Sequence, residues 1–548
     1  NRYVQPDLNA QLPIQGTPTD RLLGYRWDGQ RFVQIPFQVD KVFTRYLDNS
    51  ASGFSVYSGQ DQHTTYAFDR EGWRMYGQDP NNPCKAIPAG GVKTTPDPVP
   101  GLDTNDELAF MASDAGPQAP ANSPLPRGIV GVRAVTINDP YAPGHSTYVY
   151  VMEAGANGPR PAYNASNGYV SYMRDSNADF FELSQSNYSN YGNAAKGIIC
   201  DAQGHVIRDS HGNPVIARRR PRDYATIATS RYKFRYDGRW LMTGINVSPD
   251  GGRSYGPNLV DRWKARAFAQ DPGSKTPCCG FEEEDTHWGG SSTLLGEKVG
   301  PVRAIRETWG ADSGTNVIRR ETFYRDQVRM KSWLRVHPIP PLDGIYAQWD
   351  FAAGRMTRFY NPNVPNGVPV DGRNDTVFGN LDDPCNDNYD GNNLGTGVGG
   401  IDPNQTYRQF YRQAMVCKVS PYHQSINVSD PTFEAANASL SWAETTGPWG
   451  TIVDRTQIEK ATDLTPGAAP QDVAAVPYYR DDACFDDGTG GDPGVEQHPR
   501  DFDAEQKSTA SDGSTRRCWN ADGKAGQPGH DPAVPGGDDH FWQGDIGT

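Results

Sequence analysis

Long apolar runs are missing from this sequence of 548 residues. A helix needs ~20 consecutive apolar residues to cross a bilayer, so we expect no membrane-spanning helix. The sequence begins at Asn1 with neither a methionine nor a basic segment followed by an apolar one, which are the marks of a signal peptide. We therefore expect a processed, secreted protein that acts outside the cell or at its surface.

Positive charge is also scarce, with 52 Lys and Arg against 66 Asp and Glu and a net charge of -14. The basic residues are dispersed, which argues against a nucleic-acid partner because phosphate binding needs a basic patch. The chain has no Gly-x-Ser-x-Gly elbow, no phosphate-binding loop and no dinucleotide fingerprint. It also has no Cys-x-x-Cys-His segment, so we expect no nucleotide, haem or flavin.

Turn-forming and aromatic residues are abundant, with 59 Gly, 44 Pro, 27 Tyr, 20 Phe and 12 Trp. This composition favours many short strands joined by long ordered loops. We expect a mainly β fold, either an antiparallel β-sandwich or a multi-sheet meander, with few short helices. The segment 25–40 is a clear hairpin, because its apolar residues alternate and Asp28-Gly29 suits a tight turn.

The most regular stretch is 301–360, where apolar residues alternate with Arg, Tyr and Trp. We interpret it as adjacent antiparallel strands with one apolar face and one polar, aromatic face. Helices are expected only within 402–417, which begins at Asp402-Pro403, and within 432–443.

The length predicts more than one domain. We divide the chain into an N-terminal β region (1–160), a central antiparallel sheet region (161–380) and an Asn/Asp/Gly-rich loop with short helices (381–462). The remaining segment (463–548) is an acidic, Gly- and Pro-rich collar that we expect to wrap the body.

Eight cysteines lie beside turn-forming residues, so we expect disulfide bonds that staple loops in an oxidising compartment. Pairing cannot be deduced from spacing, but Cys484 with Cys518 is the local guess. The neighbours Cys278 and Cys279 should have different partners, because a bond between adjacent cysteines distorts the peptide. The remaining cysteines are Cys84, Cys200, Cys385 and Cys417.

Two acidic segments are candidate calcium sites. Asn386, Asn388 and Asp390 precede a glycine, as in the opening of a calcium loop, but the Glu that closes an EF-hand is missing. The second segment places Asp103, Asn105 and Glu107 two residues apart before a strand. The alternative for the first segment is an Asx-rich turn without metal, and for the second it is capping and solvation of a loop, which the spacing favours over a metal.

Two further groups of residues could act on a substrate. Glu284 and His287 could form an acid–base pair or share a cation, or could belong to a stapled acidic loop. On the predicted central sheet, Tyr324, Arg335 and His337 could support proton transfer beside a carboxylate, as in β-elimination. Sugar rings could stack on Trp333, Tyr346 and Trp349, although such aromatics can equally pack against a second sheet.

Three functions remain open from the sequence, and whether the protein is an enzyme is one of the open points. The first is binding or processing of polysaccharide on the Arg, Tyr and Trp face. The second is a structural subunit of an extracellular coat, sheath or filament, whose partners are copies of itself. The third is a metal-dependent hydrolase. Sequons for N-glycosylation, which matter only in a host that glycosylates secreted proteins, begin at Asn164, Asn187, Asn246, Asn374, Asn404, Asn427 and Asn437.

Overall fold

The structure of this protein is a computed structural model. It describes residues 14–46, 62–71, 76–88, 94–183, 196–201, 203–236, 242–269, 278–283, 293–312, 315–336, 344–351, 355–360, 366–369, 424–427, 442–455, 472–475, 478–480 and 545–547. The chain forms two compact units. The first contains Asn1–Tyr232, Thr293–Trp309 and Ile318–Trp333, and the second contains Lys233–Ser292, Gly310–Val317 and Leu334–Thr548. The division into four regions stays a prediction.

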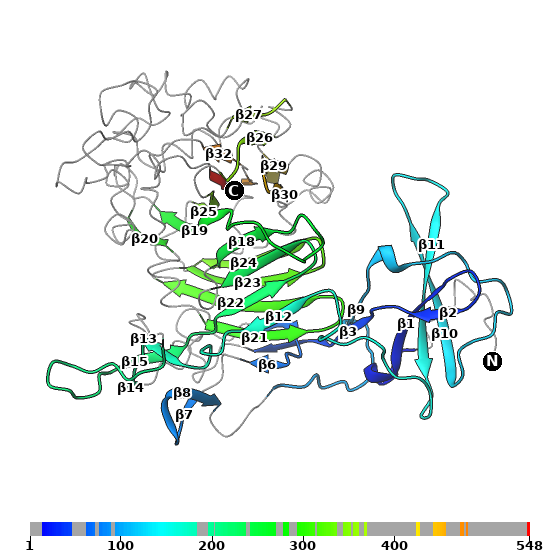
Figure 1. The fold of residues 1–548 in the computed structure, drawn as a ribbon, viewed down its shortest axis with the longest axis horizontal. Coiled ribbons are helices and arrows are strands. Elements are labelled where there is room, and N and C mark those ends of the chain that lie inside the picture. Colours follow the sequence, from blue (N-terminus) through cyan, green and yellow to red (C-terminus); the bar gives the residue numbers. More distant parts are fainter. Residues whose placement is uncertain are drawn as a thin grey trace. The chain divides into compact units, whose positions relative to one another are not determined.

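Strands dominate the described residues and form several antiparallel sheets (Figure 1), which confirms the mainly β prediction. No α-helix occurs among these residues, and two short 3-10 segments, η1 (Thr19–Arg21) and η2 (Ala112–Asp114), are the helical turns there. The helices expected within 402–417 and 432–443 lie outside the described residues. A sandwich arrangement also stays a prediction.

An N-terminal sheet has the strand order β10-β11-β1-β2. Its strands are β1 (Leu22–Trp27), β2 (Phe32–Gln34), β10 (Ile129–Asn138) and β11 (Ser146–Ala154). The pairing of Trp27 with Phe32 confirms the predicted turn, in which the Asp28 carboxylate accepts the Gln30 and Arg31 amides at 2.8 Å. Fully buried Tyr150 packs edge-on against Phe32 and closes the core of this sheet.

Most of the other strands of the first unit belong to a five-stranded sheet of order β24-β23-β22-β21-β6 and to smaller pairings. The sheet contains β6 (Arg70–Glu71), β21 (Thr293–Val299), β22 (Ala304–Asp312), β23 (Thr315–Phe323) and β24 (Val328–Val336). The smaller pairings join β3 (Gln38–Asp40) to β9 (Glu107–Ala109), β4 (Val42–Tyr46) to β5 (Gln62–Tyr66), β7 (Tyr76–Asp79) to β8 (Asn82–Pro88), and β12 (Ser171–Arg174) to β16 (Ala225–Ala228). β22, β23 and β24 are therefore adjacent, as the alternation within 301–336 predicts.

The second unit contains a five-stranded sheet of order β20-β19-β25-β33-β32 and a four-stranded sheet of order β27-β26-β29-β30. The bounds are β19 (Val260–Ala269), β20 (Cys278–Glu283), β25 (Gly344–Phe351), β32 (Tyr478–Arg480), β33 (Asp545–Gly547), β26 (Arg358–Tyr360), β27 (Val368–Pro369), β29 (Trp442–Gly447) and β30 (Gly450–Arg455). β28 (Gln424–Asn427) pairs with β31 (Asp472–Ala475), and β17 (Tyr232–Tyr236) and β18 (Met242–Val247) follow β16 along the chain. The expected continuation of the 301–360 meander through β25 is wrong, because β25 pairs with β19.

A hairpin arm, which we define as residues 196–221, extends from the first unit around β14 (Lys196–Ile198) and β15 (Ile216–Pro221) (Figure 1). Two successive turns of the same form build it. The Asp201 carboxylate accepts the His205 amide at 2.8 Å, and eight residues later the Asp209 carboxylate accepts the Asn213 amide at 2.9 Å. Each turn contains a glycine at positive φ, Gly204 at 82° and Gly212 at 81°.

Backbone hydrogen bonds also join Ile199, Ile207 and Val215, which follow one another in the arm at the same interval of eight residues as the two turns. Ile207 N donates to Ile199 O at 3.1 Å, Val215 N to Ile207 O at 2.9 Å, and Ile199 N to Val215 O at 3.3 Å. A disulfide between Cys84 and Cys200 ties the base of the arm to β8. This is the one disulfide seen among the described residues, and stapling of the loops by several disulfides stays a prediction. The other cysteines lie outside the described residues or, for Cys278 and Cys279, are described by backbone alone.

Candidate functional site

The buried guanidinium of Arg303 gathers side chains from three distant segments of the first unit. Its Nε donates to Asp40 Oδ2 at 2.8 Å, and Nη2 forms an ion pair with the same oxygen at 2.7 Å. Nη2 also donates to the Glu107 carboxylate, and Nη1 donates to Tyr324 Oη at 2.8 Å. Asp40 and Glu107 face each other across the β3–β9 pair. A single arginine therefore fixes one carboxylate from each of two strands and the phenol that follows β23.

A buried glutamine determines where Arg303 lies. Gln38 Oε1 accepts the backbone amides of Val302 and Arg303, both at 3.1 Å, and its Nε2 donates to Asp40 Oδ1 at 2.8 Å. Gly300 leaves the necessary room, because a Cβ at that position would lie 2.1 Å from Gln38 Oε1. The start of β22 is in this way held in place against β3.

The side of this group that faces solvent is formed by Glu107 and Tyr324. The Glu107 side chain is 45% exposed and Tyr324 is half-buried, whereas Asp40 is fully buried. Tyr66 Oη donates to Glu107 Oε2 at 2.9 Å from the inner side. We call Asp40, Tyr66, Glu107, Arg303 and Tyr324 the Arg303 cluster. At its surface it offers one carboxylate and one phenol in a fixed relation.

The electrostatics favour an ionised carboxylate in the Arg303 cluster. Partial burial alone would raise the pKa of Glu107, but Arg303 and the Tyr66 hydroxyl outweigh it and hold that pKa below its usual range. Burial raises the pKa of Tyr66 far above its ordinary value, so this phenol keeps its proton. Within the cluster one guanidinium faces two carboxylates, and the ammonium of Lys298 lies 4.0 Å from Asp40 beside it.

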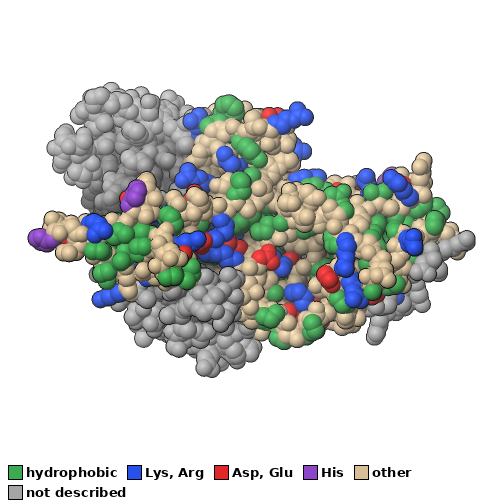
Figure 2. Space-filling model, turned by 60° about the horizontal axis from the view of Figure 1, so that its bottom comes forward, with side chains coloured by type: hydrophobic (Ala, Val, Ile, Leu, Met, Phe, Trp, Pro, Cys, Tyr) green, Lys and Arg blue, Asp and Glu red, His purple; other side chains and the backbone are tan. Residues whose placement is uncertain are grey.

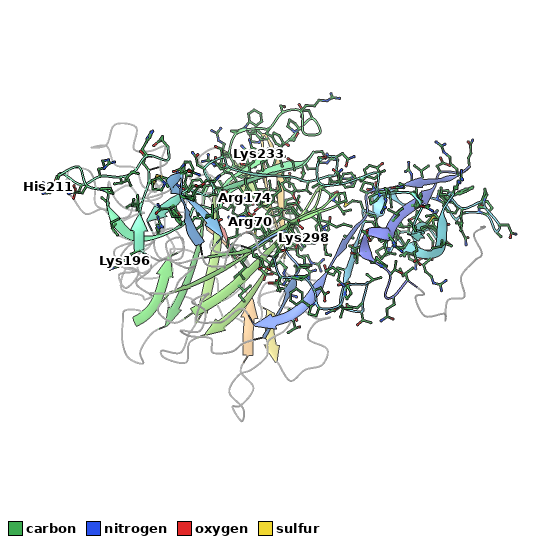
Figure 3. The ribbon with its side chains drawn as sticks, turned by 90° about the horizontal axis from the view of Figure 1, so that it is seen from below. Arg70, Arg174, Lys196, His211, Lys233 and Lys298 are labelled. Atoms are coloured by element: carbon green, nitrogen blue, oxygen red, sulfur yellow. A yellow bond between two sulfur atoms is a disulfide. The ribbon has the colours of Figure 1, made fainter. Side chains whose placement is uncertain are left out.

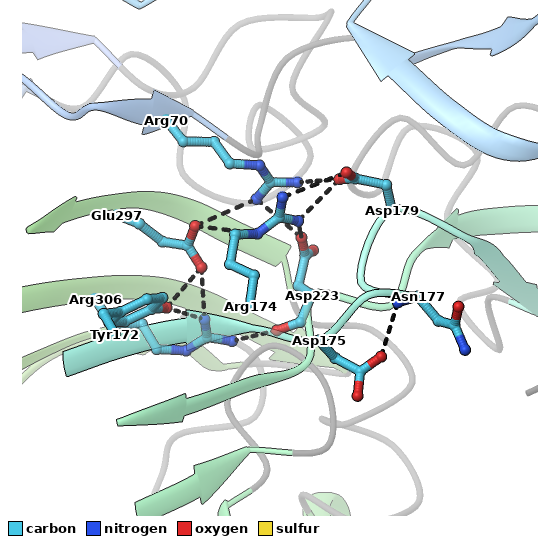
Figure 4. A network of polar contacts seen from close by, with 9 residues as sticks. All are labelled: Arg70, Tyr172, Arg174, Asp175, Asn177, Asp179, Asp223, Glu297 and Arg306. Atoms are coloured by element: carbon cyan, nitrogen blue, oxygen red, sulfur yellow. Dashed lines mark hydrogen bonds and ion pairs between the residues drawn. The ribbon is translucent and has the colours of Figure 1, made fainter. Parts of the chain in front are cut away.

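A second group of charges, drawn in Figure 4, surrounds Arg306 on β22. Arg306 is fully buried. Its Nη1 donates to Tyr172 Oη at 2.8 Å and to Glu297 Oε1 at 3.1 Å, and its Nη2 donates to the carbonyl of Asp223 at 3.1 Å. Tyr172 Oη in turn donates to Glu297 Oε1 at 2.6 Å. These bonds connect β12, β21 and β22 with the segment before β16.

Two partly exposed arginines, labelled in Figure 3, complete this group. Arg70 donates to Asp223 at 3.1 Å and to Asp179 at 3.2 Å, and Arg174 donates to Asp179 at 2.8 Å. Burial raises the pKa of Asp223, and the opposing effect of Arg70 and Arg174 does not cancel it. We call Arg70, Arg174, Arg306, Asp179, Asp223, Glu297 and Tyr172 the Arg306 network. Three arginines meet three acids, so the charges of this network are balanced, and its contacts connect strands that are remote in sequence.

In the structure, the acidic residues of the segment 103–107 contact other partners than the predicted calcium site would require. Carboxylate oxygens of Asp97, Asp103 and Asp106 lie within 4.8 Å of one another. The ammonium of Lys41 lies among them, 3.0 Å from Asp97 and 2.5 Å from Asp106. Glu107 contacts Arg303 instead, and the Asn105 backbone amide donates to Asp103 at 3.2 Å. Calcium at Asp103, Asn105 and Glu107 stays a prediction, and a lysine already supplies positive charge beside Asp106.

The other predicted site residues are described only in part or not at all. Trp333 and Arg335 lie on β24, and Tyr346 and Trp349 lie on β25, with backbone described and side chains outside the description. These two strands belong to different sheets, so the predicted continuous aromatic face is divided. His337, Glu284, His287, Asn386, Asn388 and Asp390 lie outside the described residues. Of the predicted catalytic and metal residues, Glu107 and Tyr324 are the two that the Arg303 cluster brings together.

Comparison with protein-family models, with curated proteins and with solved structures finds no match to this chain. Among the described residues, no helix has the length and apolar character needed to cross a membrane. Function has to be argued from the geometry of the first unit itself.

Proposed function

We propose that this protein is an extracellular glycan-binding protein that holds sugar hydroxyls at the Arg303 cluster. The observation that carries the proposal is the pairing of a half-exposed carboxylate, Glu107, with a half-buried phenol, Tyr324, on one buried guanidinium. Because Arg303 fixes both groups before a ligand arrives, little ordering is needed on binding. The disulfide between Cys84 and Cys200 supports an oxidising compartment.

The chemistry of the Arg303 cluster favours neutral sugars over uronates. An ionised carboxylate accepts hydrogen bonds from sugar hydroxyls, and the Tyr324 hydroxyl, which already accepts from Arg303, has its own proton to donate. A uronate would need an arginine with charge to spare. Arg303 is already opposed by Asp40 and Glu107, so it has no charge to spare for a further anion.

The same geometry favours binding over processing. Hydrolysis of a glycosidic bond needs two carboxyl groups that both reach the substrate, one of them with a raised pKa. Asp40 is fully buried, and the pKa of Glu107 is lowered. The high pKa of Tyr66 likewise opposes a role as the base of an elimination.

A glycan array containing neutral and uronate-bearing glycans, followed by calorimetry on any ligand found, tests this proposal. Tyr324→Phe should weaken binding about tenfold, since a lost hydrogen bond costs ~1–1.5 kcal/mol. Tyr141→Phe, at a position that is 95% exposed and outside the cluster, is the matched control and should leave affinity unchanged. Silence on the array, or equal affinity for Tyr324→Phe and the parent protein, would overturn the proposal.

The hairpin arm favours the structural alternative, a subunit of an extracellular assembly. Ile207 is 39% exposed and Ile216 is 60% exposed, and Figure 2 shows apolar side chains on this arm. Figure 3 places His211 at its far end. Exposed aliphatic residues on a stapled projection suit a contact with another copy of the chain. Light scattering decides between the two: a discrete monomer with glycan affinity supports binding, whereas concentration-dependent growth without it supports assembly.

A further inference from the structure

The loop between β11 and β12 contains an exposed asparagine, Asn164, whose side-chain amide nitrogen could be covalently modified. Asn164 begins the sequon Asn164-Ala165-Ser166, and Asn164 and Ser166 are both exposed. Of the seven sequons in the chain, this one and the one at Asn246 have both side chains described. They differ sharply in geometry, so they form a natural comparison.

The Asn164 side chain is held by its carbonyl oxygen alone. Asn164 Oδ1 accepts the Ser166 backbone amide at 2.8 Å and the Ser166 hydroxyl at 2.6 Å. Among the described residues, none accepts a hydrogen bond from Asn164 Nδ2. The sequon hydroxyl is thus already bonded to the acceptor side chain, and the amide nitrogen that would receive a sugar faces solvent.

The loop around Asn164 is anchored on both sides of the sequon. Asn164 N donates to Asn167 Oδ1 at 2.7 Å, and Asn167 Nδ2 donates to the carbonyl of Ala162 at 3.0 Å. Ala162 N donates to Gln34 Oε1 on β2 at 2.8 Å. Asn164 therefore stands outward from an ordered loop, and a bulky group on Nδ2 would displace no described contact.

In the sequon at Asn246, hydrogen bonds within the fold already occupy both the asparagine amide nitrogen and the serine hydroxyl. Asn246 is half-buried on β18, and its Nδ2 donates to the carbonyl of Gly256 at 3.0 Å. The hydroxyl of buried Ser248 donates to Asp250 at 3.0 Å and accepts the Gly252 amide at 2.7 Å. A sugar on Asn246 would break these contacts and open the end of the strand.

We propose that Asn164 is an acceptor for N-linked glycosylation and that Asn246 is not. The donor is a sugar whose C1 is joined through oxygen to a polyisoprenyl diphosphate. Asn164 Nδ2 attacks C1, so an N–C1 bond forms while the C1–O bond breaks. The electron pair of the broken bond leaves with the diphosphate, and one Nδ2 proton passes to a base of the transferase. The modification requires a host that performs this reaction on secreted proteins.

Glycosylation of the folded chain by a purified oligosaccharyltransferase and a lipid-linked donor tests the proposal. The enzyme used is one that modifies both synthetic peptides, 160–170 and 242–252. Site-resolved mass spectrometry of the folded full chain should then find a glycan on Asn164 and none on Asn246. Unfolding the chain before the reaction should expose Asn246 and allow both sites to be modified.

Two variants separate the sequon chemistry from the fold. Ser166→Thr keeps the hydroxyl and should keep the modification, whereas Ser166→Ala should abolish it while circular dichroism stays unchanged. A folded chain that stays unmodified at Asn164 while its peptide reacts would overturn the proposal. Equal modification of Asn164 and Asn246 in the folded chain would also overturn it, because the two geometries would then be irrelevant.

Discussion

Replacing Arg306 with Met should destabilise the first unit strongly, although it swaps one long side chain for another. Arg306 is fully buried and donates hydrogen bonds to Tyr172, Glu297 and the carbonyl of Asp223. Its loss leaves two arginines against three carboxylates in the Arg306 network. Removing one partner of a buried ion pair costs ~3–5 kcal/mol, because the remaining charge is left without compensation.

The lower end of that range is expected because compensation is partial. Glu297 still has Arg70 at 3.7 Å and Arg174 at 3.5 Å after Arg306 is removed. A second change restores the balance: Arg306→Met with Glu297→Gln leaves two arginines facing Asp179 and Asp223. The double variant should therefore be more stable than the sum of the two single losses predicts, by ~1–3 kcal/mol.

Urea unfolding followed by far-ultraviolet circular dichroism and tryptophan fluorescence measures these differences. The matched control is Arg127→Met, at an exposed position, which should change the free energy of unfolding by less than ~0.5 kcal/mol. If Arg306→Met unfolds at the same urea concentration as the control, the network does not hold the strands together. Strict additivity in the double variant would refute the coupling of Arg306 with Glu297.

Three further predictions concern other parts of the first unit. Lys41→Met should lower the melting temperature at neutral pH by leaving three aspartates together, and calcium should restore part of the loss; a calcium-independent melting temperature would contradict this. Backbone amides, chiefly those of His205 and Asn213, help hold the pKa values of Asp201 and Asp209 below the usual range. Their stabilisation should be complete above the unfolded pKa of ~3.9 and lost as pH falls through the folded pKa values. The protection factor of the Ile207 amide, which is the ratio of its intrinsic to its observed exchange rate at each pH, should therefore fall in acid; a protection factor that stays constant with pH would count against this. Changing both Cys84 and Cys200 to Ser should cost ~2–4 kcal/mol, because the bond closes a loop with a sequence separation of 116 residues, and an unchanged unfolding midpoint would show that the staple is dispensable.

Local pattern predicted local structure well. The turn at Asp28-Gly29 forms because Asp28 accepts two nearby amides and Gly29 adopts a φ of 104°. β22, β23 and β24 are neighbours in the sheet and follow one another closely along the chain. β25 could not be placed in this way, since its partner, β19, precedes it by many residues and no local signal marks the pairing.

The two charged groups were missed because their partners are remote in sequence. Alternation of Val302 and Ala304 with Arg303 predicted an arginine on an exposed face. The structure buries Arg303 against Asp40, which is 263 residues away. Arg303 lies just before β22 and Arg306 lies within it, and both can be buried only because acids from elsewhere in the chain pair with them. No periodicity within the strand indicates which acids these are.

The acidic segment at 103–107 shows the same limit on a smaller scale. Spacing alone grouped Asp103 with Glu107, but the chain bends at Thr104 and Asn105 before β9 begins at Glu107. Glu107 therefore contacts Arg303, and Asp103 joins Asp106 and the more distant Asp97. Oxygen ligands can be recognised from residue types, whereas their grouping depends on how the segment turns.

Ligand affinity of Tyr324→Phe is the measurement that bears most directly on glycan binding at the Arg303 cluster. A titration of the full chain with a neutral oligosaccharide selected on the array should show saturable binding to the parent protein. The same titration should show about tenfold weaker binding to Tyr324→Phe, with the Tyr141→Phe control unchanged. Equal affinity in all three proteins, or no saturable binding by the parent, would contradict it.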